Sequence, residues 1–333
     1  MTNATVKQSM QIPLLADIKH NRERISKWIV QTPVWQNRSW KLQQIAGPNT
    51  ELFFKLELLQ HGGSFKPRGA LVSLLNLSSE ASERGVVAAS AGNHGIGVSY
   101  AANVLGISAK IIMPRTVSPL RLERCKAYDA EVILVDTLKD AFDKMQEISV
   151  AEQRAIIHPF EGPSVALGTA GIGLELVEQI PQLDAVVVPI GGGGLCGGIA
   201  AAVKQLLPQC QIFGVEPEGA DAMYRSFQAG KPQSIEKPDT IADSLGAPYT
   251  LPYCYFLCKT FVDDVVLVSD AALRQAMRLL QEEMKLAVEP AAAAPTAAWS
   301  GPLRERLQGK RVALIISGTN IDSERFCNLL RQT

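Results

Sequence analysis

One lysine of the sequence stands in a setting that favours nucleophilic chemistry. Lys66 lies in the glycine-flanked segment 62–70, between Phe65 and Pro67, where a helix is expected to begin. The positive end of a helix dipole disfavours the ammonium form of a lysine, and burial acts in the same direction. The neutral amine that results can form a Schiff base. A solvated surface lysine is the plainer alternative, but the flanking glycines and apolar neighbours favour the nucleophile.

Four consecutive glycines form a loop that could bind an anion. Residues 191–194 follow a predicted strand, and Leu195 opens a predicted helix. Without Cβ atoms, successive backbone N–H groups can turn toward one point, and the helix adds its positive end. The loop could therefore hold a phosphate without Lys or Arg.

The same loop allows a second hypothesis. Gly192, Gly194 and Gly197 match the dinucleotide-binding spacing, and Glu216 ends the next predicted strand, where a ribose-binding acid would stand. An NAD-dependent oxidoreductase thus remains an alternative from this loop alone.

Two other polar loops follow predicted strands. The first is Ser90-Ala91-Gly92-Asn93-His94, whose backbone donors and amide suit a carboxylate or a ring hydroxyl. His94 is more readily explained as a packed, hydrogen-bonded histidine than as an acid or base. The second loop begins at Ser317, whose hydroxyl would lie at a strand carboxyl end, the edge where open α/β sheets bind ligands.

The elements that must position these loops alternate along the chain. Continuous apolar runs, rather than alternating ones, are typical of parallel strands covered by helices on both faces. Such strands are expected at 85–89, 109–113, 131–135, 184–188, 211–215 and 311–316, and helices at 120–128, 138–149, 195–207 and 270–287. The alanine-rich segment 291–298 is expected to be a packed turn and helix despite Pro295. The sequence therefore predicts an α/β fold with mostly parallel sheets.

Composition narrows the class of partner. The chain of 333 residues has 33 Lys plus Arg and 33 Asp plus Glu, so it lacks the excess positive charge of a nucleic-acid or anionic-membrane binder. Six cysteines are too few for a disulfide framework, and residues 1–19 lack a leader pattern, so a cytoplasmic location is expected. The apolar stretch 185–203 contains Pro189 and six glycines and is a poor membrane span. No metal site is predicted, since Cys254 and Cys258 lack a second ligand pair.

In their order along the chain, these motifs resemble the fold-type II pyridoxal-phosphate enzymes, most closely the threonine/serine dehydratase and serine racemase branch. Segments 31–33, 55–57 and 289–290 also take part in the resemblance. It implies two three-layer αβα domains with mostly parallel sheets, as in the tryptophan synthase β-like fold. Residues 1–77 and 160–333 would form the large cofactor-binding domain, and residues 78–159 the small inserted domain.

The resemblance also implies a role for each site residue, with pyridoxal 5'-phosphate as the cofactor. Lys66 would be the catalytic Schiff-base lysine, with Phe65 beside the cofactor ring and Ser317 facing its nitrogen. The remaining contacts would come from Asn93 to the ring hydroxyl, from Gly191, Gly192, Gly193, Gly194 and Leu195 to the phosphate, and from Ser90, Ala91 and Gly92 to the substrate carboxylate.

The implied activity is a dehydratase that converts an L-threonine- or L-serine-type substrate to a 2-oxo acid and ammonia. Phenylserine, 3-hydroxyaspartate, a hydroxyectoine-pathway intermediate and serine racemisation are the alternatives. Racemisation is not favoured, because racemases are expected to carry a serine where this chain has Ala91. The racemase-type cation site is in doubt, because Ala222 replaces an expected aspartate near Glu216. The expected partners are an amino-acid substrate and identical subunits in a homodimer or homotetramer.

Overall fold

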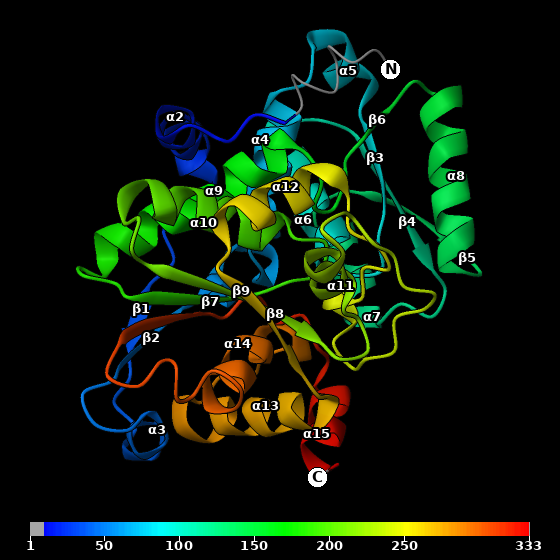
Figure 1. The fold of residues 1–333 in the computed structure, drawn as a ribbon. Coiled ribbons are helices and arrows are strands. Elements are labelled where there is room, and N and C mark those ends of the chain that lie inside the picture. Colours follow the sequence, from blue (N-terminus) through cyan, green and yellow to red (C-terminus); the bar gives the residue numbers. More distant parts are fainter. Residues whose placement is uncertain (1–9, 333) are drawn as a thin grey trace.

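The computed structural model describes residues 10–332. The expectation about the N-terminus concerns residues 1–19, of which 1–9 lie outside the described part, as does residue 333. The described chain contains one larger and one smaller β-sheet, each covered by helices (Figure 1).

The larger sheet has six strands in the order β1-β2-β10-β7-β8-β9. Only the β1–β2 pairing is antiparallel among these described strands; the others are parallel. The smaller sheet has four parallel strands in the order β5-β4-β3-β6. The strands are β1 (Val34–Gln36), β2 (Glu51–Lys55), β3 (Val86–Ala89), β4 (Ala109–Pro114), β5 (Glu131–Val135), β6 (Ala155–Ile156), β7 (Ala185–Pro189), β8 (Gln211–Pro217), β9 (Asp264–Val268) and β10 (Arg311–Ile315).

Helices cover both faces of each sheet, which explains why the central strands are apolar throughout. In the larger sheet, α9, α10 and α12 lie on one face and α3, α13, α14 and α15 on the other (Figure 1). The α-helices are α2 (Leu15–Ile25), α3 (Trp40–Ala46), α4 (Lys66–Leu75), α5 (Ser79–Arg84), α6 (Asn93–Leu105), α7 (Pro119–Ala127), α8 (Leu138–Ala151), α9 (Pro163–Gln179), α10 (Gly194–Leu206), α11 (Ala222–Ala229), α12 (Pro252–Phe261), α13 (Asp270–Met284), α14 (Pro290–Ser300) and α15 (Ser323–Arg331). Short 3-10 helices are η1 (Ser26–Trp28), η2 (Glu57–Leu59), η3 (His61–Gly63) and η4 (Asp243–Leu245).

The α/β class and the six expected strands are confirmed, with two differences in detail. The helix expected over 270–287 ends at Met284, because Lys285 adopts a left-handed conformation with φ of 59° that closes the helix. The strand at 131–135 is only half-buried, because β5 lies at the edge of its sheet. β1, β2, β6 and β9 were not predicted.

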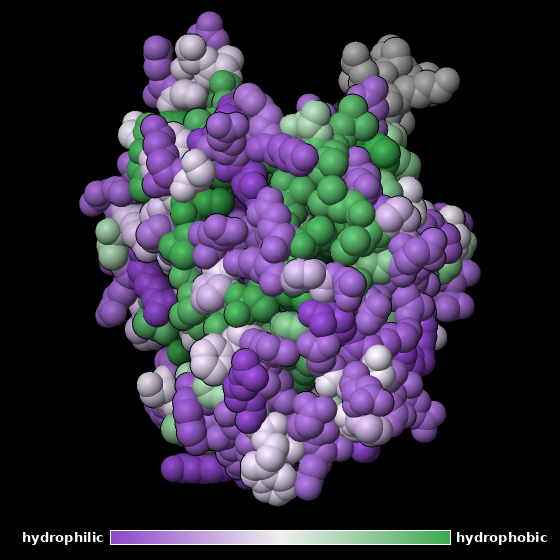
Figure 2. Space-filling view, turned by 90° about the vertical axis from the view of Figure 1, so that its left-hand side faces the viewer, coloured by the Kyte–Doolittle hydropathy of each residue, from purple (hydrophilic) through white to green (hydrophobic). Residues whose placement is uncertain are grey.

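The surface combines polar and apolar regions. On the face shown in Figure 2, apolar residues gather in the upper part, whereas the lower part is mostly polar. Within residues 10–332, no helix has both the length and the apolar character needed to span a membrane.

Candidate active site

The predicted site residues surround one cavity of about 280 Å³. It lies at the carboxyl ends of β3, β7 and β10, the edge at which α/β sheets bind ligands. The structure brings together every residue that the sequence assigned to the site, namely Phe65, Lys66, Ser90, Ala91, Gly92, Asn93, Gly191, Gly192, Gly193, Gly194, Leu195 and Ser317. Segments up to about 250 residues apart in the sequence therefore meet at one place.

Lys66 is the first residue of α4, as expected. Its Nζ donates a hydrogen bond of 2.7 Å to the backbone oxygen of Pro159 and lies 5.1 Å from the centre of the Phe65 ring. Burial lowers the pKa of Lys66 from its ordinary 10.5 to about 8, against the opposing charge of Glu289. About a tenth of this amine is therefore neutral, and nucleophilic, at pH 7, far more than for a lysine of ordinary pKa.

The glycine loop is shaped by close packing against Phe160. A Cβ atom on Gly192 would lie 2.1 Å from Cγ of the Phe160 ring, so a larger residue fits there only if the loop or the ring shifts. Gly193 has φ of 98°, a backbone conformation that favours glycine. Helix α10 begins at Gly194 and directs its positive end toward the loop. The loop therefore has the features of an anion cradle formed by backbone groups.

The loop after β3 is held by its own side chains. Ser90 Oγ accepts hydrogen bonds from the backbone nitrogens of Gly92 and Gly95, at 3.2 and 3.1 Å. Asn93, the first residue of α6, donates from Nδ2 to Glu289 Oε1 at 2.6 Å. This arrangement fixes the backbone that lines the cavity.

The loop after β10 is fastened to the loop that carries Lys66. The backbone nitrogen of Phe65 donates to the oxygen of Ser317 at 3.2 Å, and that of Thr319 donates to the oxygen of Gly63 at 2.9 Å. Asn320 Nδ2 adds a bond of 2.7 Å to the oxygen of Gly62. Ser317 is thereby held beside the lysine segment.

Sequence reasoning missed the functional position of Glu289. This carboxyl precedes α14, is 1% exposed and lines the cavity. Burial raises its pKa to about 7, although Arg121 acts in the opposite direction. Oε2 has no hydrogen-bond partner in the described structure. Two signals in the sequence point to this position: segment 289–290 takes part in the family resemblance, and an acidic residue stands within the mostly apolar run 286–298.

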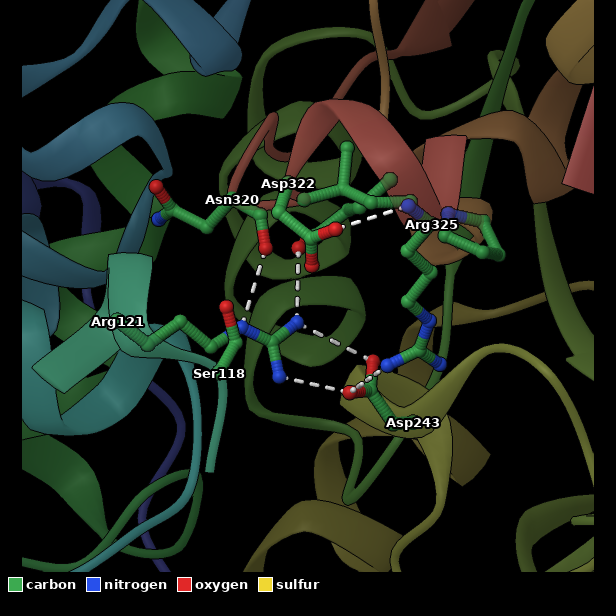
Figure 3. Close-up of a pocket in the computed structure, with 9 residues that line it drawn as sticks. Ser118, Arg121, Asp243, Asn320, Asp322 and Arg325 are labelled. Carbon is green, nitrogen blue, oxygen red and sulfur yellow. Dashed lines mark hydrogen bonds and ion pairs between the residues drawn. The ribbon is translucent and has the colours of Figure 1, made fainter. Parts of the chain in front are cut away.

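An ionic cluster beside Glu289 joins α7 to η4 and to the loop after β10 (Figure 3). Arg121 donates to Asp243 Oδ2 at 2.7 Å and to the backbone oxygen of Asn320 at 3.0 Å. Its Nη2 also lies 3.7 Å from Glu289 Oε2, and Arg325 approaches Asp243 at 3.5 Å. Arg121 and Asp243 line the cavity, but they form an ion pair with each other, which largely neutralises both charges.

Two other candidate side chains, His94 and Glu216, lack the surroundings that a catalytic acid or base and a ribose-binding acid would need. His94 is buried, bonds through Nε2 to the oxygen of Ile157 at 2.8 Å, and has a pKa lowered by burial to about 3, so it is a packed neutral histidine. Glu216 is not among the residues that line the cavity. Its carboxylate accepts hydrogen bonds from the backbone nitrogens of Met223 and Tyr224, at 3.0 and 2.7 Å. The geometry therefore does not form the ribose-binding acid of a dinucleotide site.

Comparison with known proteins shows the class to which this site belongs. Residues 25–318 match the family model of pyridoxal-phosphate dependent enzymes. A phenylserine dehydratase of Ralstonia pickettii is 49% identical over 96% of this chain and 97% of its own. An L-threonine ammonia-lyase of Thermotoga maritima is 37% identical over 92% of this chain and 76% of its own. The structure of maize serine racemase superimposes with a TM-score of 0.90, at 32% identity, over 97% of this chain and 98% of that one.

The chain belongs to the pyridoxal-phosphate-dependent enzymes of fold type II. Within this family it is a lyase of the ammonia-lyase type, and the predicted family, fold class and cofactor are confirmed. The cavity fits the cofactor chemically, because it joins a buried amine of lowered pKa to a glycine loop that excludes Cβ atoms at Gly192.

Proposed function

We propose that the protein eliminates water from a β-hydroxy amino acid of the L-threonine or L-serine type, and that hydrolysis of the resulting imine takes up one water and gives a 2-oxo acid and ammonia. The observation that carries this proposal is the placement of Lys66 and the glycine loop on one cavity. The names of the relatives, a phenylserine dehydratase and an L-threonine ammonia-lyase, support the same reaction class.

Pyridoxal phosphate supplies the electron-withdrawing ring that stabilises negative charge on the substrate Cα atom. The chain's own residues divide the remaining work. Lys66 Nζ would hold the cofactor, and its neutral amine would take the proton from the substrate Cα atom. Its lowered pKa makes the amine available as a base near neutral pH. Lys66 is therefore the proposed catalytic residue.

The loops around the cavity would fix the reactants. Backbone N–H groups of residues 191–194, with Leu195 and the start of α10, would hold the phosphate. Residues 90–92 would hold the substrate carboxylate, and Asn93 the ring hydroxyl. Ser317 would face the ring nitrogen, and a neutral serine does not force that nitrogen to remain protonated. Phe65 would pack beside the ring.

Replacing the lysine tests the proposal directly. We expect Lys66→Ala to lose the visible absorbance of the lysine-linked cofactor and to release ammonia at least about 10³-fold more slowly. Wild-type protein should release ammonia from threonine, serine, phenylserine or 3-hydroxyaspartate. Absence of ammonia from all four with cofactor-loaded wild type would show that the proposed reaction is wrong.

We also propose the organisation of the molecule in the cell. Residues 1–77 and 160–333 form the cofactor-binding domain and 78–159 an inserted domain, which the location of β3 to β6 supports.

A homodimer or homotetramer is supported by exposed apolar side chains near the N-terminus, including Trp35 at 53% and Leu59 at 50% exposure. A cytoplasmic location is supported by the low cysteine content. Light scattering of the purified protein tests the assembly.

A further inference from the structure

Two large apolar side chains face the cavity without being covered. Leu138 and Phe142 line it, yet they remain 51% and 38% exposed. They are four residues apart on α8, so they share one face of the helix. The buried residues Ala141, Met145 and Ile148 belong instead to the core that α8 forms with the smaller sheet.

The position of this apolar pair is fixed by the start of α8. This helix begins three residues after β5, at the carboxyl edge of the smaller sheet, and it stands along that sheet (Figure 1). Thr137 Oγ1 accepts a hydrogen bond from the backbone nitrogen of Asp140 at 3.1 Å, and Asp140 Oδ2 accepts one from that of Thr137 at 3.0 Å. Such a capping box holds the first helical turn. The capping box thus fixes where α8 begins, next to Leu138, whose side chain lines the cavity.

Other segments add apolar residues to the lining of the same cavity. Pro248 and Tyr249 line it, as does Phe160. The Phe160 and Tyr249 rings lie 6.1 Å apart between centroids and are inclined by 52°. Aromatic rings bind further rings at such separations in edge-to-face or offset geometry.

The charges in the lining do not suit an acidic side chain on the substrate. Among the described residues that line the cavity, the Lys and Arg residues are Lys66 and Arg121. Lys66 is assigned to the cofactor, and Arg121 is paired with Asp243 at 2.7 Å. A second substrate carboxylate would therefore find no free cation, and it would lie near Asp243 and Glu289.

We propose that Leu138, Phe142 and Tyr249 bind an aromatic group on the substrate β-carbon, so that the preferred substrate is a β-aryl-β-hydroxy amino acid. This inference rests on the proposed dehydratase function and specifies its substrate class. The polar loops bind the parts that all α-amino acids share, whereas this apolar wall binds the part that differs. When the aromatic ring of the substrate covers the exposed Leu138 and Phe142 side chains, the hydrophobic effect favours aryl substrates over serine.

The experiment compares kcat/KM for phenylserine, serine and 3-hydroxyaspartate, measured by ammonia release from the holoenzyme. We expect wild type to prefer phenylserine over serine by about 100-fold or more, because a hydrophobic pocket gains roughly tenfold for each one or two buried carbons. Phe142→Ala should lower the ratio of kcat/KM for phenylserine to kcat/KM for serine at least about tenfold. Most of this change should be a higher KM for phenylserine. Phe142→Tyr should restore most of the ratio.

Val150→Ala is the matched control, because Val150 is on the same helix, is 78% exposed and does not line the cavity. It should leave the ratio unchanged. The inference is overturned if wild type prefers serine or 3-hydroxyaspartate, or if Phe142→Ala slows all substrates equally. Those outcomes differ from failure of the dehydratase proposal, in which wild type releases ammonia from none of the substrates.

Discussion

The amine of Lys66 is bound by a backbone carbonyl, that of Pro159, at 2.7 Å. A neutral acceptor stabilises the ammonium ion less than a carboxylate would, so burial can lower the pKa of Lys66 to about 8. Pro159 directly precedes Phe160, whose ring packs against Gly192. The short segment 159–160 thus contacts both the lysine and the glycine loop.

Filling the space above Gly192 should weaken cofactor binding. In Gly192→Ala the new Cβ would meet the Phe160 ring at 2.1 Å, so the loop must shift. We expect the apparent Kd for pyridoxal phosphate, measured by fluorescence titration, to rise at least about tenfold, the equivalent of about 1.4 kcal/mol. Phe160→Ala in the same chain should recover part of this loss. Gly171→Ala is the control, since its nearest contact is 3.7 Å away; an equal loss there would contradict the steric explanation.

The buried carboxyl of Glu289 should make the stability of the cofactor-free protein depend on pH. Its pKa is raised from 4.5 to about 7 in the folded state, so between these pH values the folded chain holds a proton that the unfolded chain releases. Stability should therefore fall as pH rises from about 4.5 to 7, by up to about 3 kcal/mol at about 1.4 kcal/mol per pKa unit. In Glu289→Gln this contribution disappears, and urea unfolding at pH 5 and pH 8 measures it. A difference between variant and wild type that does not change with pH would refute the assignment.

Arg68 should be essential to the fold that presents Lys66. Its guanidinium is 0% exposed and donates to Glu57 of η2 at 2.8 Å and to Glu175 of α9 at 2.7 Å. Arg68→Met would leave these carboxylates with less compensation, at a cost of about 3–5 kcal/mol in the free energy of unfolding. Arg22→Met, which removes the exposed pair with Glu178, should cost less than about 1 kcal/mol. Similar costs for both variants in urea unfolding would show that burial of the network does not matter.

Ala91 should limit the enzyme to elimination. It lines the cavity together with Lys66, and a methyl group cannot exchange a proton with the substrate. We expect wild type to release ammonia with little interconversion of L- and D-serine, whereas Ala91→Ser should add measurable racemisation in chiral chromatography. Wild-type racemisation as fast as ammonia release would contradict this prediction. The ammonia assay on the same samples is the control for activity.

Much of the fold and site follows from local sequence. Continuous apolar runs identify the central strands, because a strand buried on both faces is apolar at nearly every position. The loops after β7 and β10 lie together because these parallel strands are neighbours in one sheet and end at the same edge. The loop after β3 belongs to the other sheet, and the sequence grouped it with them through the family resemblance. The glycine run predicted the anion cradle, because only backbone without Cβ atoms can turn so many N–H groups toward one point. β1 and β6 were missed because strands of three and two residues are too short to form a recognisable apolar run.

Only the tertiary structure decided which distant groups meet the lysine. The site also contains Pro159, Phe160 and Glu289, which reach it because segments far apart in the sequence pack together. A local sequence pattern shows which face of a helix or strand is apolar, but it does not show which segment covers that face. The same holds for Leu138 and Phe142, whose spacing predicts one helix face. The sequence by itself determined the lysine, the glycine loop and the order of the site motifs along the chain. Packing decided the lowered pKa, the buried carboxyl and the apolar wall, because each depends on contacts made only when both sheets are assembled.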